Sequence, residues 1–231
     1  MLDAFRGVAI VAMIVYHFCF DLALNGWLTA DFGEDWRWIA FRVPILGSFL
    51  FAAGVSLGLA GRDGFDERRY WRRVGIVAAA AALVTAGSAL LFPDSYIYFG
   101  VLHAIAVMSV LGRGLLPLGK WLVLLGIGII AAGVTLKYPA FDAPALHWIG
   151  MMTFKPRTED YVPLFPWFGV FLVGAAIGGW RHRDHRPPMI PAWTPARALR
   201  WLPWLGRHSL AIYLVHQPLL LGTMQVVKLL G

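Results

Sequence analysis

Long hydrophobic runs, separated by short polar segments, dominate the pattern of this chain. Most of these runs are close in length to a membrane-spanning helix, which needs about 20 apolar residues to cross a bilayer. They lack the strict alternation of a membrane β-barrel, so each run is predicted to be a helix. The sequence therefore predicts an all-α integral membrane protein, a helical bundle of about seven transmembrane helices forming one domain over residues 1–231. The predicted spans are 5–25, 38–60, 74–92, 97–112, 115–136, 163–180 and 207–229.

The composition excludes a separate water-soluble domain. Of the 231 residues, 59% are apolar and 14% are charged, whereas an ordinary soluble domain has about 45–50% and about 25%. A net charge of +7 would suggest nucleic acid in a soluble protein. Here most basic residues lie between the hydrophobic runs, so they indicate membrane topology and no nucleic-acid partner. The single cysteine, Cys19, lies within the first run and is interpreted as an inert small residue.

The distribution of Lys and Arg predicts the orientation of the chain. If the N-terminus is cytoplasmic, most of the 20 basic residues fall on the inner side, as the positive-inside rule requires. The prediction is an N-terminus inside and a C-terminus outside, in a bacterial-type cytoplasmic (inner) membrane that the chain crosses several times. Membrane lipids are therefore expected partners. The basic residues left outside are Arg37, Arg42, Lys137, Lys155, Arg157 and Lys228.

Two predicted spans carry glycines at the spacing of close helix packing. Gly54 and Gly58 form one G-x-x-x-G pair, and Gly174 and Gly178 form another. Such pairs let two backbones approach closely. They favour helix–helix packing within the chain, and they would also allow a homodimer or a narrow wall beside a ligand.

Polar side chains inside the first run suggest chemistry. Arg6 and His17 return to nearly the same helix face about 16 Å apart, and Asp21 follows one turn later on that face. A neutral imidazole can take a proton from a hydroxyl or an amine, and a carboxylate one turn away can orient it. These residues could instead simply tie helices together, because intramembrane polar groups often pair with one another.

Other spans add polar groups at similar depth. His103 in the fourth span and His216 in the seventh lie near half depth, as His17 does, and Gln217 adds an amide beside His216. Arg42 enters the second span at about the depth of Asp21, so a structural ion pair between them is predicted. Arg6, Arg113 and Arg207 lie on the predicted cytoplasmic side, where arginine can bind phosphate. The same arginines would also serve topology and anionic lipid headgroups.

Five stretches in order resemble a known family. The R-x10-H pattern of Arg6 and His17 is similar to that of acyltransferase-3-type membrane acyltransferases. Most of the chain resembles bacterial proteins grouped with the catalytic domain of heparan-alpha-glucosaminide N-acetyltransferase. The stretches that carry the resemblance are FRGVAIVAMIVYHFCFDL (5–22), ILGSFLFAAGVSLGLA (45–60), YFGVLHAIAVMSVLGRG (98–114), DYVPLFPWFGVFLVGAAIG (160–178) and LGRHSLAIYLVHQPLLL (205–221).

This resemblance implies a transmembrane acyltransferase. Such enzymes take an acyl group, typically acetyl from acetyl-CoA, at the cytosolic side and deliver it to a sugar hydroxyl or amine on the far side. His17 would be the catalytic histidine and Arg6 its motif partner. His103 falls in the stretch that corresponds to a GVLQR-like motif, with His-Ala where Gln-Arg is common. The chain is also shorter than relatives with ten or more spans.

The leading hypothesis is an acyl-CoA-dependent O- or N-acyltransferase acting on a glycan or a lipid-linked sugar, with acetyl-CoA or another acyl-CoA as co-substrate and no metal. His17 would be the general base, Asp21 would orient it, and Arg6, Arg113 and Arg207 would bind the CoA phosphates. One alternative is a transporter or flippase for a polar or lipid substrate. Another is a haem or metal protein using His17, His103 and His216. The candidate acceptor-side residues are His103, Tyr161, Trp167, His216, Gln217 and Arg42.

Overall fold

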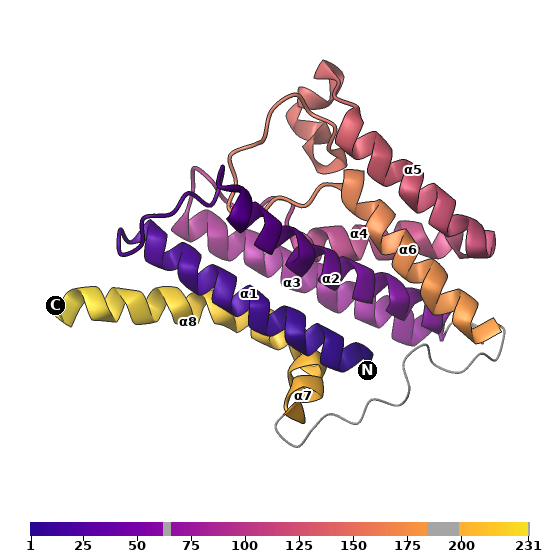
Figure 1. The fold of residues 1–231 in the computed structure, drawn as a ribbon, viewed down its shortest axis with the longest axis horizontal. Coiled ribbons are helices and arrows are strands. Elements are labelled where there is room, and N and C mark those ends of the chain that lie inside the picture. Colours follow the sequence, from indigo (N-terminus) through magenta and orange to yellow (C-terminus); the bar gives the residue numbers. More distant parts are fainter. Residues whose placement is uncertain (62–65, 184–198, 231) are drawn as a thin grey trace. The chain divides into compact units, whose positions relative to one another are not determined.

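The computed structural model describes residues 1–61, 66–183 and 199–230, which fold into helices joined by turns, without a strand among them (Figure 1). Three short 3-10 helices, η1 to η3, interrupt the sequence of α-helices. The elements are α1 (Leu2–Leu24), α2 (Trp36–Ala60), α3 (Glu67–Leu91), α4 (Val101–Leu115), η1 (Leu116–Trp121), α5 (Leu122–Thr135), η2 (Pro139–Asp142), η3 (Pro144–Ile149), α6 (Leu164–Arg183), α7 (Leu202–Arg207) and α8 (Ser209–Leu230).

The all-helical fold was predicted from the hydrophobic pattern, but the number of spans differs. Five segments of the described chain are long and apolar enough to cross a membrane: Leu2–Leu24, Trp36–Ala60, Glu67–Leu91, Val101–Thr135 and Ser209–Leu230. The fourth combines α4 and α5, which are separate helices broken at η1, where Gly119 has a φ of 56°. The sixth predicted span corresponds to the shorter apolar helix Leu164–Trp180. The count of seven spans stays a prediction.

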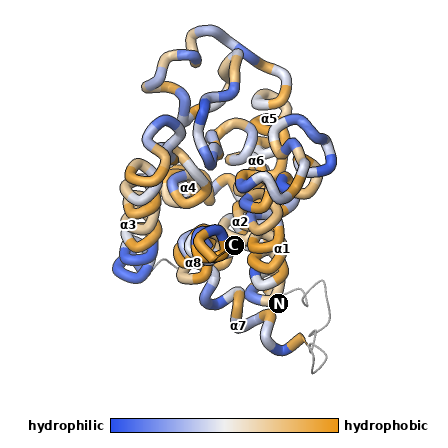
Figure 2. The backbone as a smooth tube through the Cα atoms, turned by 90° about the vertical axis from the view of Figure 1, so that its left-hand side faces the viewer, coloured by the Kyte–Doolittle hydropathy of each residue, from blue (hydrophilic) through white to orange (hydrophobic). Residues whose placement is uncertain are grey.

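Hydrogen bonds at the helix starts explain where two boundaries differ from the predicted ones. Helix α3 begins seven residues before the predicted 74, because the Asp66 carboxylate accepts the Arg69 backbone N–H at 3.0 Å and caps the helix. This cap draws an arginine-rich segment into the helix, and Figure 2 shows it as a hydrophilic end. Helix α4 begins at Val101 rather than 97, because its first N–H donates to Asp160 Oδ2 at 2.9 Å.

The chain divides into two compact units. The terminal unit contains Met1–Phe49 and Ile190–Gly231, and the central unit contains Leu50–Met189. In the terminal unit, Gly7 lies against the Leu202 backbone and Gly206 lies against the Asp3 backbone, so that an added Cβ would overlap a carbonyl at either position. These two glycines hold the short helix α7 against the first turns of α1. The chain then turns into α8.

In the central unit, the two G-x-x-x-G pairs pack against one another. Gly54 and Gly58 of α2 face the backbone of α6, and Gly174 and Gly178 of α6 face the backbone of α2. Any added Cβ would overlap a carbonyl oxygen of the other helix. The prediction of close helix packing is confirmed. Both glycine faces are covered within the chain, and a homodimer stays a prediction.

Candidate active site between α1 and α8

Helices α1 and α8 lie side by side in the terminal unit and run in the same direction (Figure 1). Three contacts follow one another along both helices: the His17 ring meets the His216 ring, Asp21 bonds Gln217, and Asn25 Nδ2 reaches Met224 Sδ at 3.4 Å. We call the polar residues of these contacts, His17, Asp21, His216 and Gln217, the α1–α8 seam. The seam brings together two predicted catalytic residues and two predicted acceptor-side residues from opposite ends of the sequence.

Asp21 is completely buried, with an exposed fraction of 0%. Its Oδ1 accepts the Nε2–H of Gln217 at 2.8 Å, whereas Oδ2 has no hydrogen-bond partner. The predicted ion pair with Arg42 is wrong, because Oδ1 bonds Gln217 and Oδ2 has no partner. A buried carboxyl group without a cation is costly in free energy. Such a group in a membrane protein is a strong candidate for function.

Among the described residues, three buried side-chain nitrogen or oxygen atoms lack a hydrogen-bond partner, and all three belong to the seam. They are Asp21 Oδ2, His216 Nε2 and Gln217 Oε1, and no other buried side-chain atom of the described residues shares this state. Buried polar atoms are normally bonded, so exceptions call for a reason. Three exceptions on four neighbouring residues make the seam the candidate site of this chain.

His17 contacts His216 and not Asp21. The two imidazole rings lie edge to face with centroids 5.0 Å apart. No hydrogen bond joins His17 to Asp21, although both lie on the predicted helix face, because the carboxylate is turned toward Gln217. No direct contact between Asp21 and His17 therefore supports the expectation that Asp21 orients His17.

Two of the predicted phosphate-binding residues lie at the other end of α1. Arg6 forms an ion pair with Asp3 at 3.3 Å, and Arg207 is exposed at the end of α7. The backbone contact of Gly206 with Asp3 places the end of α7 beside this first turn of α1. The terminal unit thus presents two cations at the start of α1, and the seam follows further along the same helix.

The third predicted phosphate-binding residue belongs to the central unit. Arg113 forms an ion pair with Glu67 and lies over the Tyr70 ring, 4.9 Å from its centroid. It also lies 5.6 Å from the centroid of Trp71. A phosphate would have to compete with Glu67 for this guanidinium.

His103 has a bond at each ring nitrogen. Its Nδ1 accepts the Gly100 backbone N–H at 3.2 Å. The Thr85 hydroxyl donates to the Ile97 carbonyl, so it accepts from His103 Nε2 at 3.1 Å. Both nitrogens serve to hold the start of α4 against α3, which favours a structural role for His103.

The two aromatic residues predicted on the acceptor side also lie in the central unit. The Tyr161 hydroxyl donates to the His147 carbonyl at 2.6 Å. Burial raises the pKa of this hydroxyl, so it stays protonated as a donor. Trp167 is half-buried in the first turns of α6. Neither residue lines the two pockets of the terminal unit.

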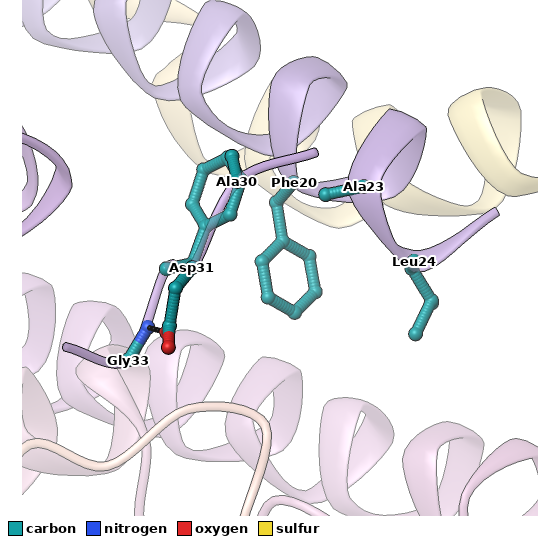
Figure 3. A pocket seen from close by; sticks show the side chains of 7 residues that line it. Phe20, Ala23, Leu24, Ala30, Asp31 and Gly33 are labelled. Atoms are coloured by element: carbon teal, nitrogen blue, oxygen red, sulfur yellow. Dashed lines mark hydrogen bonds between the residues drawn. The ribbon is translucent and has the colours of Figure 1, made fainter. Parts of the chain in front are cut away.

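Those two pockets flank the loop between α1 and α2 in the terminal unit. One has a volume of about 420 Å³ (Figure 3), and the other, of about 340 Å³, shares Ala30 with it. The sequence pattern did not single out these residues as a site. Aromatic residues on both sides of the loop were the available signal. The pockets are lined by Phe20, Ala23, Leu24, Ala30, Asp31, Phe32 and Gly33, and by Leu28, Thr29, Ala30, Asp35, Arg37, Trp38 and Phe41.

The geometry disfavours the haem alternative. The His17 and His216 rings contact each other directly, which leaves no space between them for a porphyrin plane. Among the described residues, no group of three or more His, Cys, Asp or Glu side chains is arranged to hold a metal ion.

The described residues include five helical segments long and apolar enough to cross a membrane, which makes this chain a multi-pass membrane protein. The family model of the heparan-alpha-glucosaminide N-acetyltransferase catalytic domain matches residues 1–218, so the chain belongs to that family. The family indicates a membrane acetyltransferase, and the resemblance noted in the sequence is confirmed. No curated protein and no solved structure matches the chain.

Proposed function

We propose that this protein transfers an acyl group, usually acetyl, from cytosolic acyl-CoA to a hydroxyl or an amine of a glycan or a lipid-linked sugar. The observation that carries the proposal is the cluster of unpartnered buried atoms in the α1–α8 seam, in a chain that belongs to an acetyltransferase family. An acyl transfer needs a base for the acceptor's proton, and the seam offers two imidazoles.

His17 is the proposed general base. The acceptor oxygen or nitrogen attacks the thioester carbonyl carbon, and His17 takes the proton that it loses. The carbon–sulfur bond then breaks, and the CoA thiolate receives the proton from His17. The products are the acylated acceptor and free CoA, and no further reactant is needed.

Arg6 and Arg207 are the proposed donor-side residues. Arg6 lies in the first turns of α1, and Arg207 ends helix α7, which packs against those turns. Guanidinium groups bind phosphate oxygens well. In the proposed orientation this end is cytoplasmic, where acyl-CoA is available. Arg113 is a separate candidate, since it lies in the central unit and is already paired with Glu67.

The acceptor side is proposed to lie near the other end of α1. The loop pockets there combine the aromatic rings of Phe20, Phe32 and Trp38 with the charged Asp31, Asp35 and Arg37. Aromatic faces and carboxylates suit a polyhydroxylated ligand. Tyr161, Trp167, His103 and Arg42 remain secondary candidates for acceptor contacts.

Binding of acetyl-CoA to the detergent-purified protein tests the proposal. Wild type is compared with Arg6→Ala, His17→Ala and, as a matched arginine control, Arg37→Ala at the start of α2. We expect saturable binding that weakens about tenfold or more in Arg6→Ala and persists in the other two variants. Absence of binding by acetyl-CoA and by longer acyl-CoAs would contradict the proposal and favour transport.

A further inference from the structure

The structure gives His17 a neighbour that the sequence pattern did not predict. Asp21, the expected orienting residue, is bonded to Gln217. From the neighbouring helix α8, the ring of His216 contacts His17, with centroids 5.0 Å apart. His216 is buried with an exposed fraction of 8%, so water does not compete freely for this contact.

Hydrogen bonding to the backbone of α8 fixes the tautomer of neutral His216. Its Nδ1 lies 2.7 Å from the Tyr213 carbonyl oxygen, one turn earlier in α8. A carbonyl can only accept, so Nδ1 carries the proton and donates it to this bond. Nε2 then holds a lone pair, and this buried atom has no partner. His216 is therefore a pre-oriented acceptor beside His17.

We propose that His216 is the positioning residue of His17 in acyl transfer, accepting a hydrogen bond at Nε2 from the ring N–H of His17. This inference rests on the proposed function. When His17 takes the acceptor's proton at one ring nitrogen, its other nitrogen carries an N–H that His216 stabilises. No hydrogen bond to a described residue holds the His17 ring in place, so it can rotate into this bond.

The hydrogen bond between Gln217 and Asp21 fixes the position of His216 beside His17. Gln217 follows His216 directly, and its bond to the fully buried Asp21 ties α8 to α1 at this level. A rotation of α8 that removed His216 from His17 would break that bond and leave both partners buried. Asp21 thus acts on His17 through the position of α8.

Histidine also suits this position electrostatically. A carboxylate beside His17 would need a countercharge in an apolar surrounding. A neutral imidazole with one lone pair can stabilise an imidazolium without that cost. While His17 is charged, His216 Nε2 accepts the hydrogen bond from one ring N–H of His17. The proton on the other ring nitrogen, which came from the acceptor, leaves with the CoA thiolate.

Two substitutions at position 216 test the proposal in the full chain. His216→Leu fills similar space without an acceptor, and His216→Gln retains an acceptor oxygen at comparable reach. We expect kcat to fall about 100-fold or more in His216→Leu, with acetyl-CoA affinity unchanged. The kcat of His216→Gln should be at least tenfold higher than that of His216→Leu. Val215→Ala, on the exposed side of α8, is the control for a general effect on the helix.

A second measurement does not depend on turnover or on variant folding. NMR of the wild-type protein labelled with ¹⁵N in histidine should show His216 protonated at Nδ1. A His216 protonated at Nε2 would overturn the proposal, and so would a folded His216→Leu variant with wild-type kcat. A wild-type protein that binds no acyl-CoA would instead contradict the proposed function.

Discussion

Gln217 of α8 donates a hydrogen bond from Nε2 to Oδ1 of the fully buried Asp21 of α1 over 2.8 Å. The two residues are 196 positions apart in the sequence. This bond joins α1 to α8 at the level of the proposed reaction site. It also accounts for the failure of Asp21 to contact His17.

Loss of this bond should lower the stability of the protein. Gln217→Leu leaves the Asp21 carboxyl group buried without a donor, and we expect a cost of about 1–3 kcal/mol in the free energy of unfolding. Thermal unfolding in detergent measures it. Asp21→Asn retains an acceptor oxygen and should cost less than Gln217→Leu. The idea fails if Gln217→Leu unfolds at the wild-type temperature.

Substitution of the proposed base should separate binding from chemistry. His17→Gln removes the imidazole and retains a polar side chain. We expect acyl transfer to fall by about 10²- to 10⁴-fold, the usual contribution of a general base, while acetyl-CoA still binds. Single-turnover transfer from radiolabelled acetyl-CoA measures the loss. Full activity in a folded His17→Gln protein would refute the assignment.

The packing of α2 against α6 should not tolerate a single added methyl group. In Gly54→Ala the new Cβ overlaps the Phe171 carbonyl, and overpacking of this kind costs about 1–3 kcal/mol. Gly87→Ala in α3 is the matched control, because nothing lies within 4 Å of its added Cβ. Alanine is the better helix former, so Gly87→Ala should be neutral or slightly stabilising. Comparable unfolding temperatures for the two variants would contradict this packing.

The loop between α5 and α6 should weaken in acid. Hydrogen bonds from the Thr153 hydroxyl and backbone N–H lower the pKa of Asp142 below its ordinary value. A carboxyl group with a lowered folded-state pKa contributes fully above its ordinary pKa of about 3.9. That contribution is lost as the pH falls through the folded-state pKa. Thr153→Val should raise this pKa and move the loss to higher pH, as NMR titration of Asp142 would show. An unchanged titration would contradict the role of the hydroxyl.

The C-terminus should lie on the outer face of the membrane. Because α1 and α8 run parallel, two complete crossings by them would place their far ends on the same side. An alkaline phosphatase fused after Leu230 should therefore be active, and a green fluorescent protein fused there should stay dark. A bright fluorescent fusion with an inactive phosphatase would reverse the predicted topology.

Several features of the fold could be predicted from hydrophobicity and helical spacing. Continuous apolar runs specify helices because lipid cannot satisfy backbone hydrogen bonds, and Gly54, Gly58, Gly174 and Gly178 indicated close packing. The starts of α3 and α4 could not be predicted in the same way. They depend on side-chain caps from Asp66 and Asp160, which a hydrophobicity pattern does not detect.

The sequence by itself determined the class of protein, the helices and the residue types that chemistry would need. Helical periodicity placed His17 and Asp21 on one face, but it could not decide which groups they meet. Only the tertiary structure paired Asp21 with Gln217 and His17 with His216. The reason is physical: spacing along one helix fixes direction, whereas contacts depend on the rotation and register of the helix packed against it.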